Sequence, residues 1–156
     1  MSPSLDLLTT LLNMGKSGWI KALQDRDVVK THLVATLHKI ADEIDEKALV
    51  VNDNDISYGI TLNSLGNNAT FLGSMLFQRC ASGARIIVPG SSKEIDGIVF
   101  DNFGTSHDDY PHQYMTVAAA LGTSKHEIDS FFERFRTCVA KFQNHTKQCM
   151  ITSSVS

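Results

Sequence analysis

The sequence has few of the features that mark several broad classes of protein. It contains three cysteines, none of them in a CxxC pair, so the sequence indicates neither a disulfide framework nor a zinc site. It also contains only three prolines among its 156 residues. It has no apolar run of the roughly 18–20 residues that cross a bilayer. Its first residues, MSPSLD, lack the basic and apolar regions of a signal peptide. We therefore expect a soluble, intracellular protein that binds no metal.

The chain also lacks an excess of positive charge, since its formal net charge is −3. This balance excludes a histone-like coat of basic residues and leaves room only for a local basic site on one face. A content of 42% hydrophobic and 20% charged residues is typical of a globular chain. The length fits one domain. We expect that domain over residues 1–146, followed by a polar, disordered tail over 147–156.

The spacing of apolar residues predicts a mixture of helices and strands. Repeats at three and four positions predict helices over 3–14, 17–46, 68–79, 111–121 and 124–142, with Gly15 separating the first two. Alternating or β-rich runs predict strands over 48–51, 56–62, 84–88 and 97–100, the first two adjacent and the last two paired as a hairpin. Residues 101–110 read as a loop. This order favours an α+β fold in which helices cover a small antiparallel sheet.

No complete active site is visible in the sequence. It has no GxSxG elbow, no GxxxxGK[ST] phosphate loop and no GxGxxG before a helix. The densest polar cluster lies at residues 104–110, where His107 is a candidate base or anion ligand. The simpler alternative is a surface loop in which Asp108 and Asp109 cap the next helix.

Two arginines form the other candidate site. Arg79 and Arg85 flank a Ser-Gly-Ala turn between a predicted helix and a predicted strand. Two guanidinium groups placed there could hold a phosphate or carboxylate, or read the edge of a guanine. The alternative is structural, with Arg79 bonded to the last carbonyls of its own helix and Arg85 in a surface ion pair.

Three stretches of the sequence resemble a known family. They are SPSLDLLTTLLNMGKSGW (2–19), LGSMLFQRCASGARI (72–86) and SHDDYPHQYMTVAAALG (106–122), and they are similar, in the same order, to the carboxyl-terminal part of O-phosphoseryl-tRNA(Sec) selenium transferases. The resemblance implies a pyridoxal-phosphate enzyme of fold type I that converts phosphoseryl-tRNA to selenocysteinyl-tRNA with selenophosphate. It also implies a cytoplasmic homotetramer.

The resemblance implies roles for a few residues of this chain. Arg79 matches the arginine that reads the discriminator base at the tRNA acceptor end, with Gln78 beside it. The family's last helix ends in a basic cluster that contacts the tRNA backbone, and the matching place here is near Asn144, flanked by Lys141 and Lys147. Arg85 and His107 match family positions to which the resemblance gives no role, and they stay candidate anion ligands on the reasoning above. The family's cofactor lysine, phosphate loop and phosphoserine-binding arginine all precede the SPSLD motif at residues 2–6. We therefore expect neither bound pyridoxal phosphate nor activity from this chain alone.

The favoured interpretation is the small C-terminal domain of this transferase, which helps to position the acceptor end of tRNA(Sec). In fold-type I enzymes such a domain packs on the large cofactor domain through its first helices, so residues 3–44 are expected to present an apolar surface. One alternative is a non-catalytic tRNA-binding or protein-interaction module. Another is the small domain of a different fold-type I enzyme, such as a lyase or desulfurase, although the motif around Arg79 argues against it.

Overall fold

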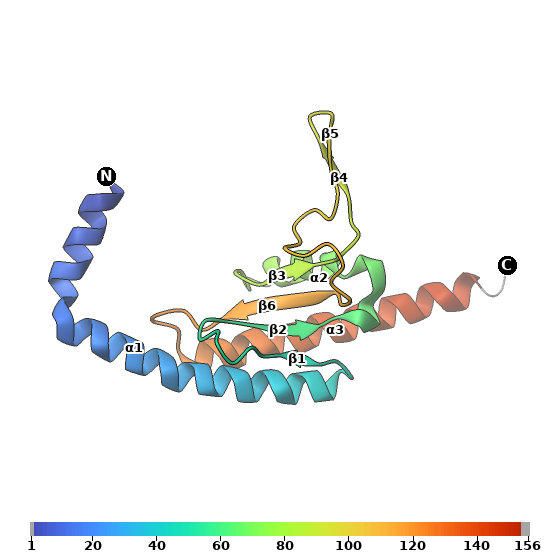
Figure 1. The fold of residues 1–156 in the computed structure, drawn as a ribbon. Coiled ribbons are helices and arrows are strands. Elements are labelled where there is room, and N and C mark those ends of the chain that lie inside the picture. Colours follow the sequence, from blue (N-terminus) through green and yellow to red (C-terminus); the bar gives the residue numbers. More distant parts are fainter. Residues whose placement is uncertain (1, 154–156) are drawn as a thin grey trace.

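The computed structural model describes residues 2–153, and its backbone has the α+β architecture that the sequence predicts (Figure 1). A four-stranded antiparallel sheet has the order β1-β2-β6-β3, and β4 and β5 form a separate hairpin. The elements are α1 (Pro3–Glu43), β1 (Ala48–Leu49), β2 (Ser57–Thr61), η1 (Asn63–Asn68), α2 (Thr70–Phe77), β3 (Arg85–Ile87), β4 (Lys93–Ile95), β5 (Ile98–Phe100), β6 (Tyr114–Ala118) and α3 (Lys125–Ser153).

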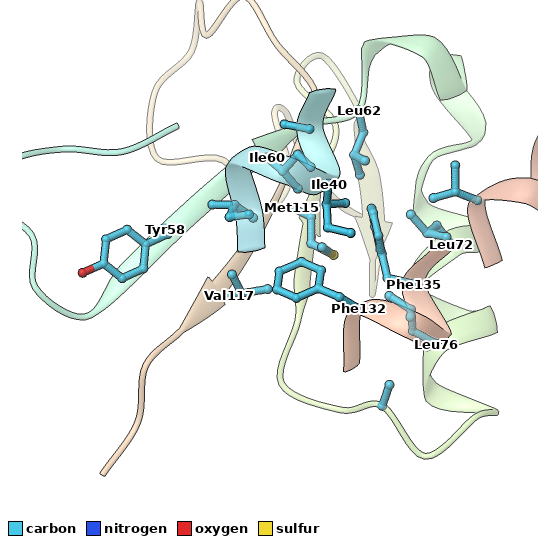
Figure 2. Packing of buried hydrophobic residues seen from close by; sticks show 14 of the residues in the cluster. Ile40, Tyr58, Ile60, Leu62, Leu72, Leu76, Met115, Val117, Phe132 and Phe135 are labelled. Atoms are coloured by element: carbon cyan, nitrogen blue, oxygen red, sulfur yellow. The ribbon is translucent and has the colours of Figure 1, made fainter. Parts of the chain in front are cut away.

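The core lies where the helices meet the sheet. In Figure 1, α1 and α3 run side by side along one side of the sheet. Figure 2 shows Phe132 and Phe135 of α3 among side chains from β2, β6, α1 and α2. Both phenylalanines are almost completely buried. Burying a side chain of this size stabilises a fold by roughly 1.5–3 kcal/mol. This cluster therefore holds the helices against the sheet. Ile128 and Val139 of α3 are buried as well, whereas Phe131 and Phe142 are only partly buried against the core.

Ion pairs join α1 and α3 at the rim of this core. Arg136 donates from Nε and Nη2 to the two carboxylate oxygens of Glu43, at 2.6 and 2.9 Å. The hydrogen bond from Arg136 lowers the pKa of Glu43. Nε2 of His32 lies 2.7 Å from Oδ1 of Asp129. Partly exposed pairs of this kind contribute little to the free energy of unfolding. They join α1 and α3 at two positions, which favours one alignment of the two helices.

The first two predicted helices are joined as α1, with a sharp bend at Gly15. Its φ of 58° and ψ of −178° lie outside the helical range, in a region that glycine adopts without a steric penalty. The predicted break at Gly15 is therefore confirmed. The segment before it, residues 3–14, turns away from the body of the molecule in Figure 1. Its leucines are exposed, for example Leu8 at 52% and Leu12 at 74%.

The predicted helix over 111–121 is wrong, because residues 114–118 form β6 at the centre of the sheet. β6 pairs antiparallel with β2 on one side and with β3 on the other. Met115 and Val117 point into the core, and Ala119 is also buried. Burial at every second residue is the pattern of a strand. The spacing of Tyr114 and Leu121, which also fits a helix, therefore gave the wrong prediction. Asp108 and Asp109 consequently have no following helix to cap.

The predicted hairpin between 84–88 and 97–100 is also wrong. β3 pairs with β6, while β5 pairs with β4 in a register that places Ile95 opposite Ile98. The two residues between them, Asp96 and Gly97, both have positive φ, at 52° and 77°. An Asp-Gly pair in this conformation is a strong signal for a two-residue hairpin. The hairpin projects from the sheet in Figure 1. Residues 101–110, which follow it in the chain, form the predicted loop.

The last helix extends beyond its predicted end. α3 continues to Ser153, through most of the segment 147–156 that the sequence suggested as a tail, and the last three residues of that segment lie outside the described range. Lys, Gln and Met are good helix formers, so a helix can continue there without apolar periodicity. Within residues 2–153, no helix combines the length and apolarity of a membrane span.

The motif LGSMLFQRCASGAR contains the end of α2 and a tight stop. Ala81 N–H donates to the carbonyl of Leu76 and Cys80 N–H to the carbonyl of Phe77, both at 3.0 Å. These two bonds define a Schellman motif, in which the residue after the cap takes a left-handed conformation. That residue is Cys80, with φ 55°. Arg79 is therefore the last residue of the helical turn, and its backbone position is fixed by this cap.

Replacing Cys80 by glycine should stabilise the fold. A residue with a Cβ in the left-handed region costs about 1 kcal/mol more than glycine, and the Cys80 side chain is exposed. We expect Cys80→Gly to raise the free energy of unfolding in urea by about that amount. The matched control is Cys80→Ala, which keeps the Cβ and should give no gain. Equal stability of the two variants would contradict the cap assignment.

Candidate nucleic-acid interface

Two stretches of the chain contain no carboxylate side chain. Residues 56–93 include Arg79, Arg85 and Lys93, and residues 134–156 include Arg134, Arg136, Lys141 and Lys147. Together they hold half of the 14 Lys and Arg residues and none of the 17 Asp and Glu residues. The fold brings them together, because α2 of the first stretch packs against α3, which continues to Ser153 within the second. Arg136 is neutralised by Glu43 of α1 and Arg85 binds another part of the surface, so the positive charge on the α2–α3 side comes from Arg79, Arg134 and Lys141 among the described residues. A local basic site of this kind is the electrostatic requirement for binding a nucleic acid.

A groove of about 520 Å³ lies between α2 and α3. Gln78 from the end of α2 and Lys141 from α3 both line it, and both side chains are exposed. The remaining lining residues are Asn68, Phe71, Ser74, Met75 and Phe142. No carboxylate is among these described residues, whereas each of the four other hollows described contains at least one. The groove therefore suits a polyanion better than any of the other four.

Arg79 directly follows Gln78 in the chain and is partly buried, and it is not among the residues that line the groove. Its Nη1 donates to the carbonyl of Met75 at 2.8 Å, four residues earlier in the same helix. Burial raises the pKa of the neighbouring Cys138 thiol, while hydrogen bonding and charge from Arg79 and the charge of Lys141 oppose this shift. Arg79 and Lys141 thus act on the same thiol, from α2 and α3 respectively. The bond to Met75 is the structural role that the sequence analysis gave as the alternative for Arg79. It uses one of the five guanidinium N–H donors, so the others can still contact a ligand.

Arg134 stabilises the turn that follows Arg79. Its Nη1 donates to the carbonyl of Cys80 at 2.9 Å, which anchors the Schellman turn to α3. The sequence analysis did not single out this residue. No sequence signal singles it out, because the partner is a backbone carbonyl 54 residues away in the chain.

Arg85 and His107 belong to a different part of the surface. Nη2 of Arg85 donates to the carbonyl of Gly104 at 2.5 Å, so Arg85 binds the loop that carries His107 instead of forming the surface ion pair suggested as its alternative. Nδ1 of exposed His107 accepts a hydrogen bond from Asp109 N–H at 3.2 Å. The two arginines of the motif thus bind carbonyls of different segments. The structure brings together Gln78, Arg79 and Lys141, and separately Arg85 with the His107 loop.

No metal centre is apparent in the part of the chain that the structure describes. It contains no group of three or more His, Cys, Asp or Glu side chains placed to hold an ion.

Comparisons with known proteins agree on one family. The family model for O-phosphoseryl-tRNA(Sec) selenium transferase matches residues 1–140. The enzyme of that name from Dictyostelium discoideum is 41% identical, over 85% of this chain and 32% of its own length. The one from Caenorhabditis briggsae is 32% identical, over 90% of this chain and 30% of its own length.

A solved structure gives the same result for the fold. The crystal structure of an archaeal O-phosphoseryl-tRNA(Sec) selenium transferase superposes with a TM-score of 0.71 at 20% identity, covering 86% of this chain and 28% of that one. The chain thus spans about a third of the length of the curated relatives it matches. Because the family model covers most of the sequence, the chain belongs to the O-phosphoseryl-tRNA(Sec) selenium transferase family.

Proposed function

We propose that this chain is the part of such a transferase that contacts the acceptor end of tRNA(Sec), through Arg79, Gln78 and Lys141. The observation that carries the proposal is a groove lined by Gln78 and Lys141 and by no carboxylate among its described residues, in a chain of net charge −3, with Arg79 directly after Gln78. Arginine suits a guanine edge because its forked donors match O6 and N7. Lysine suits a phosphate as a mobile point charge.

The reaction of the whole enzyme converts O-phosphoseryl-tRNA to selenocysteinyl-tRNA with selenophosphate, and pyridoxal phosphate supplies the electron sink for it. Three lysines of this chain line hollows among the described residues, and none has surroundings that suit that cofactor. Lys39 shares its hollow with Asp129 and Arg136, which are already paired with His32 and Glu43. Lys30 is held by Asp55 at 2.8 Å, which raises its pKa and keeps it charged. Lys141 lines a groove without a carboxylate for a pyridine nitrogen. The proposal therefore assigns the cofactor to the part of the relatives that this chain does not cover, about two thirds of their length.

The same proposal gives the exposed leucines of residues 3–14 a partner, the large cofactor domain of the same cytoplasmic, homotetrameric enzyme. Leu8 and Leu12 lie one turn apart on the same face of the helix, and five leucines of this segment are exposed by 43–74%. A surface of this kind on an isolated domain promotes association.

Charges on that face should therefore keep the 156-residue chain monomeric. We expect the unmodified chain to self-associate with rising concentration and the double variant Leu8→Glu, Leu12→Glu to sediment as a monomer with the same helix content. The changes are at exposed positions, so the fold should persist. A chain that is monomeric at high concentration without the substitutions would contradict the proposed apolar contact.

Arg79→Ala should change the preference for the discriminator base. If Arg79 reads that base, removing it should cost about 1–3 kcal/mol of discrimination at this single position. The measurement is binding of acceptor-stem RNAs that carry each of the four bases there. Lys141→Gln provides the contrast, because loss of a phosphate contact should weaken all four RNAs alike and lower the salt dependence of binding.

The structural alternative for Arg79 predicts another result. If its only role is the bond to Met75, Arg79→Ala should lower the melting temperature and leave the four relative affinities unchanged. That combination would remove the recognition role from the proposal.

A further inference from the structure

We propose that the groove between α2 and α3 binds an unpaired nucleotide, with its base stacked on Phe71 and its phosphate paired with Lys141. The inference rests on the proposed function for the class of partner, an RNA. It adds a base-stacking subsite that depends on an aromatic side chain of this chain.

Phe71 is the first observation in favour of this subsite. It lies in the first turn of α2, yet its side chain is 61% exposed, although the helical periodicity suggested a place in the apolar face. The buried side of α2 is formed by Leu72 and Leu76. Phe71 instead shares the groove side with Ser74 and Gln78, three and seven residues further on. The core does not use this ring, and an open aromatic face in a cationic groove is the usual platform for a nucleobase.

The polar groups around Phe71 match the remaining parts of a nucleotide. The amides of Asn68 and Gln78 each offer a donor and an acceptor to a base edge, and exposed Lys141 offers its ammonium to a phosphate. Met75 and Phe142 supply apolar lining. The groove's volume of about 520 Å³ lies within the usual range for small-molecule sites, roughly 300–1,000 Å³.

Charge complementarity favours a single-stranded nucleic acid over an apolar protein segment. The lining has one cation and no carboxylate among its described residues, and the chain on both sides of the groove lacks acidic residues over 56–93 and 134–156. A protein helix would gain little from two amides and a lysine. A duplex does not present the face of a base to an aromatic ring, whereas an unpaired end does.

The test is binding of a short, unstructured, fluorescently labelled RNA to the 156-residue chain and its variants. Stacking on one aromatic ring contributes about 5- to 150-fold in affinity, so Phe71→Leu should lose an amount in this range, while Phe71→Tyr should keep most of the binding. Phe77→Leu is the matched control, because Phe77 is on the same helix, is 73% exposed and does not line the groove. Lys141→Gln should lower the salt slope by about 0.7 for one lost contact to a single strand.

Each result has a definite meaning. Equal RNA affinity of Phe71→Leu and the unmodified chain overturns the stacking subsite. Equal losses for Phe71→Leu and Phe77→Leu also overturn it, since they indicate a general effect on α2. The proposed function fails separately: if acceptor-stem binding is insensitive to Arg79→Ala while Phe71→Leu still weakens the short RNA, the subsite stands and the acceptor-end assignment is wrong.

Discussion

The burial of the aromatic face of α3 is the interaction on which the rest of the structure depends. α3 packs against both α1 and α2, and Phe132 and Phe135 are buried where these helices meet the sheet. Because one helix serves as the common support, the end of α2 is fixed relative to the second half of α3. Arg134 strengthens this arrangement through its bond to the Cys80 carbonyl. The groove and the position of Arg79 both follow from the packing.

The same packing separates the charges of the chain. The segments that meet at the groove have no carboxylates over 56–93 and 134–156, and all 17 acidic residues lie elsewhere. The net charge of −3 therefore does not reflect the local charge at the groove between α2 and α3. Lys141 lines a groove that has no carboxylate among its described lining residues, which favours the approach of a ligand with phosphates.

The sequence predicted the features that depend on local chemistry. Gly15 marked the bend of α1. The Ser-Lys-His-Glu sequence at 124–127 has the spacing of a capping box, and the structure forms one, with Ser124 N–H and Oγ both donating to Glu127 at 2.7 and 2.8 Å. The hydrogen bonds from Ser124 lower the pKa of Glu127. The resemblance of the motif around Arg79 identified the family that the comparisons show.

The features that depend on distant partners could not be predicted in the same way. Residues 114–118 satisfy both a helical and an alternating pattern, and only pairing with β2 and β3 decides for the strand. The exposure of Phe71 likewise depends on how α2 lies against α3. For the hairpin the signal was present, as Asp96 and Gly97. The short strand over 93–95 was not predicted, so residues 97–100 were paired with residues 84–88 instead of with it.

The central claim is that the surface joining α2 to the second half of α3 contacts the acceptor end of tRNA. Hydrogen exchange of backbone amides, measured by mass spectrometry on the 156-residue chain with and without an acceptor-stem RNA, tests it most directly. The account predicts slower exchange in peptides covering residues 68–83 and 134–144, and no change in those covering the hairpin at 93–100. Protection confined to the hairpin, or to residues 3–14, would contradict the claim.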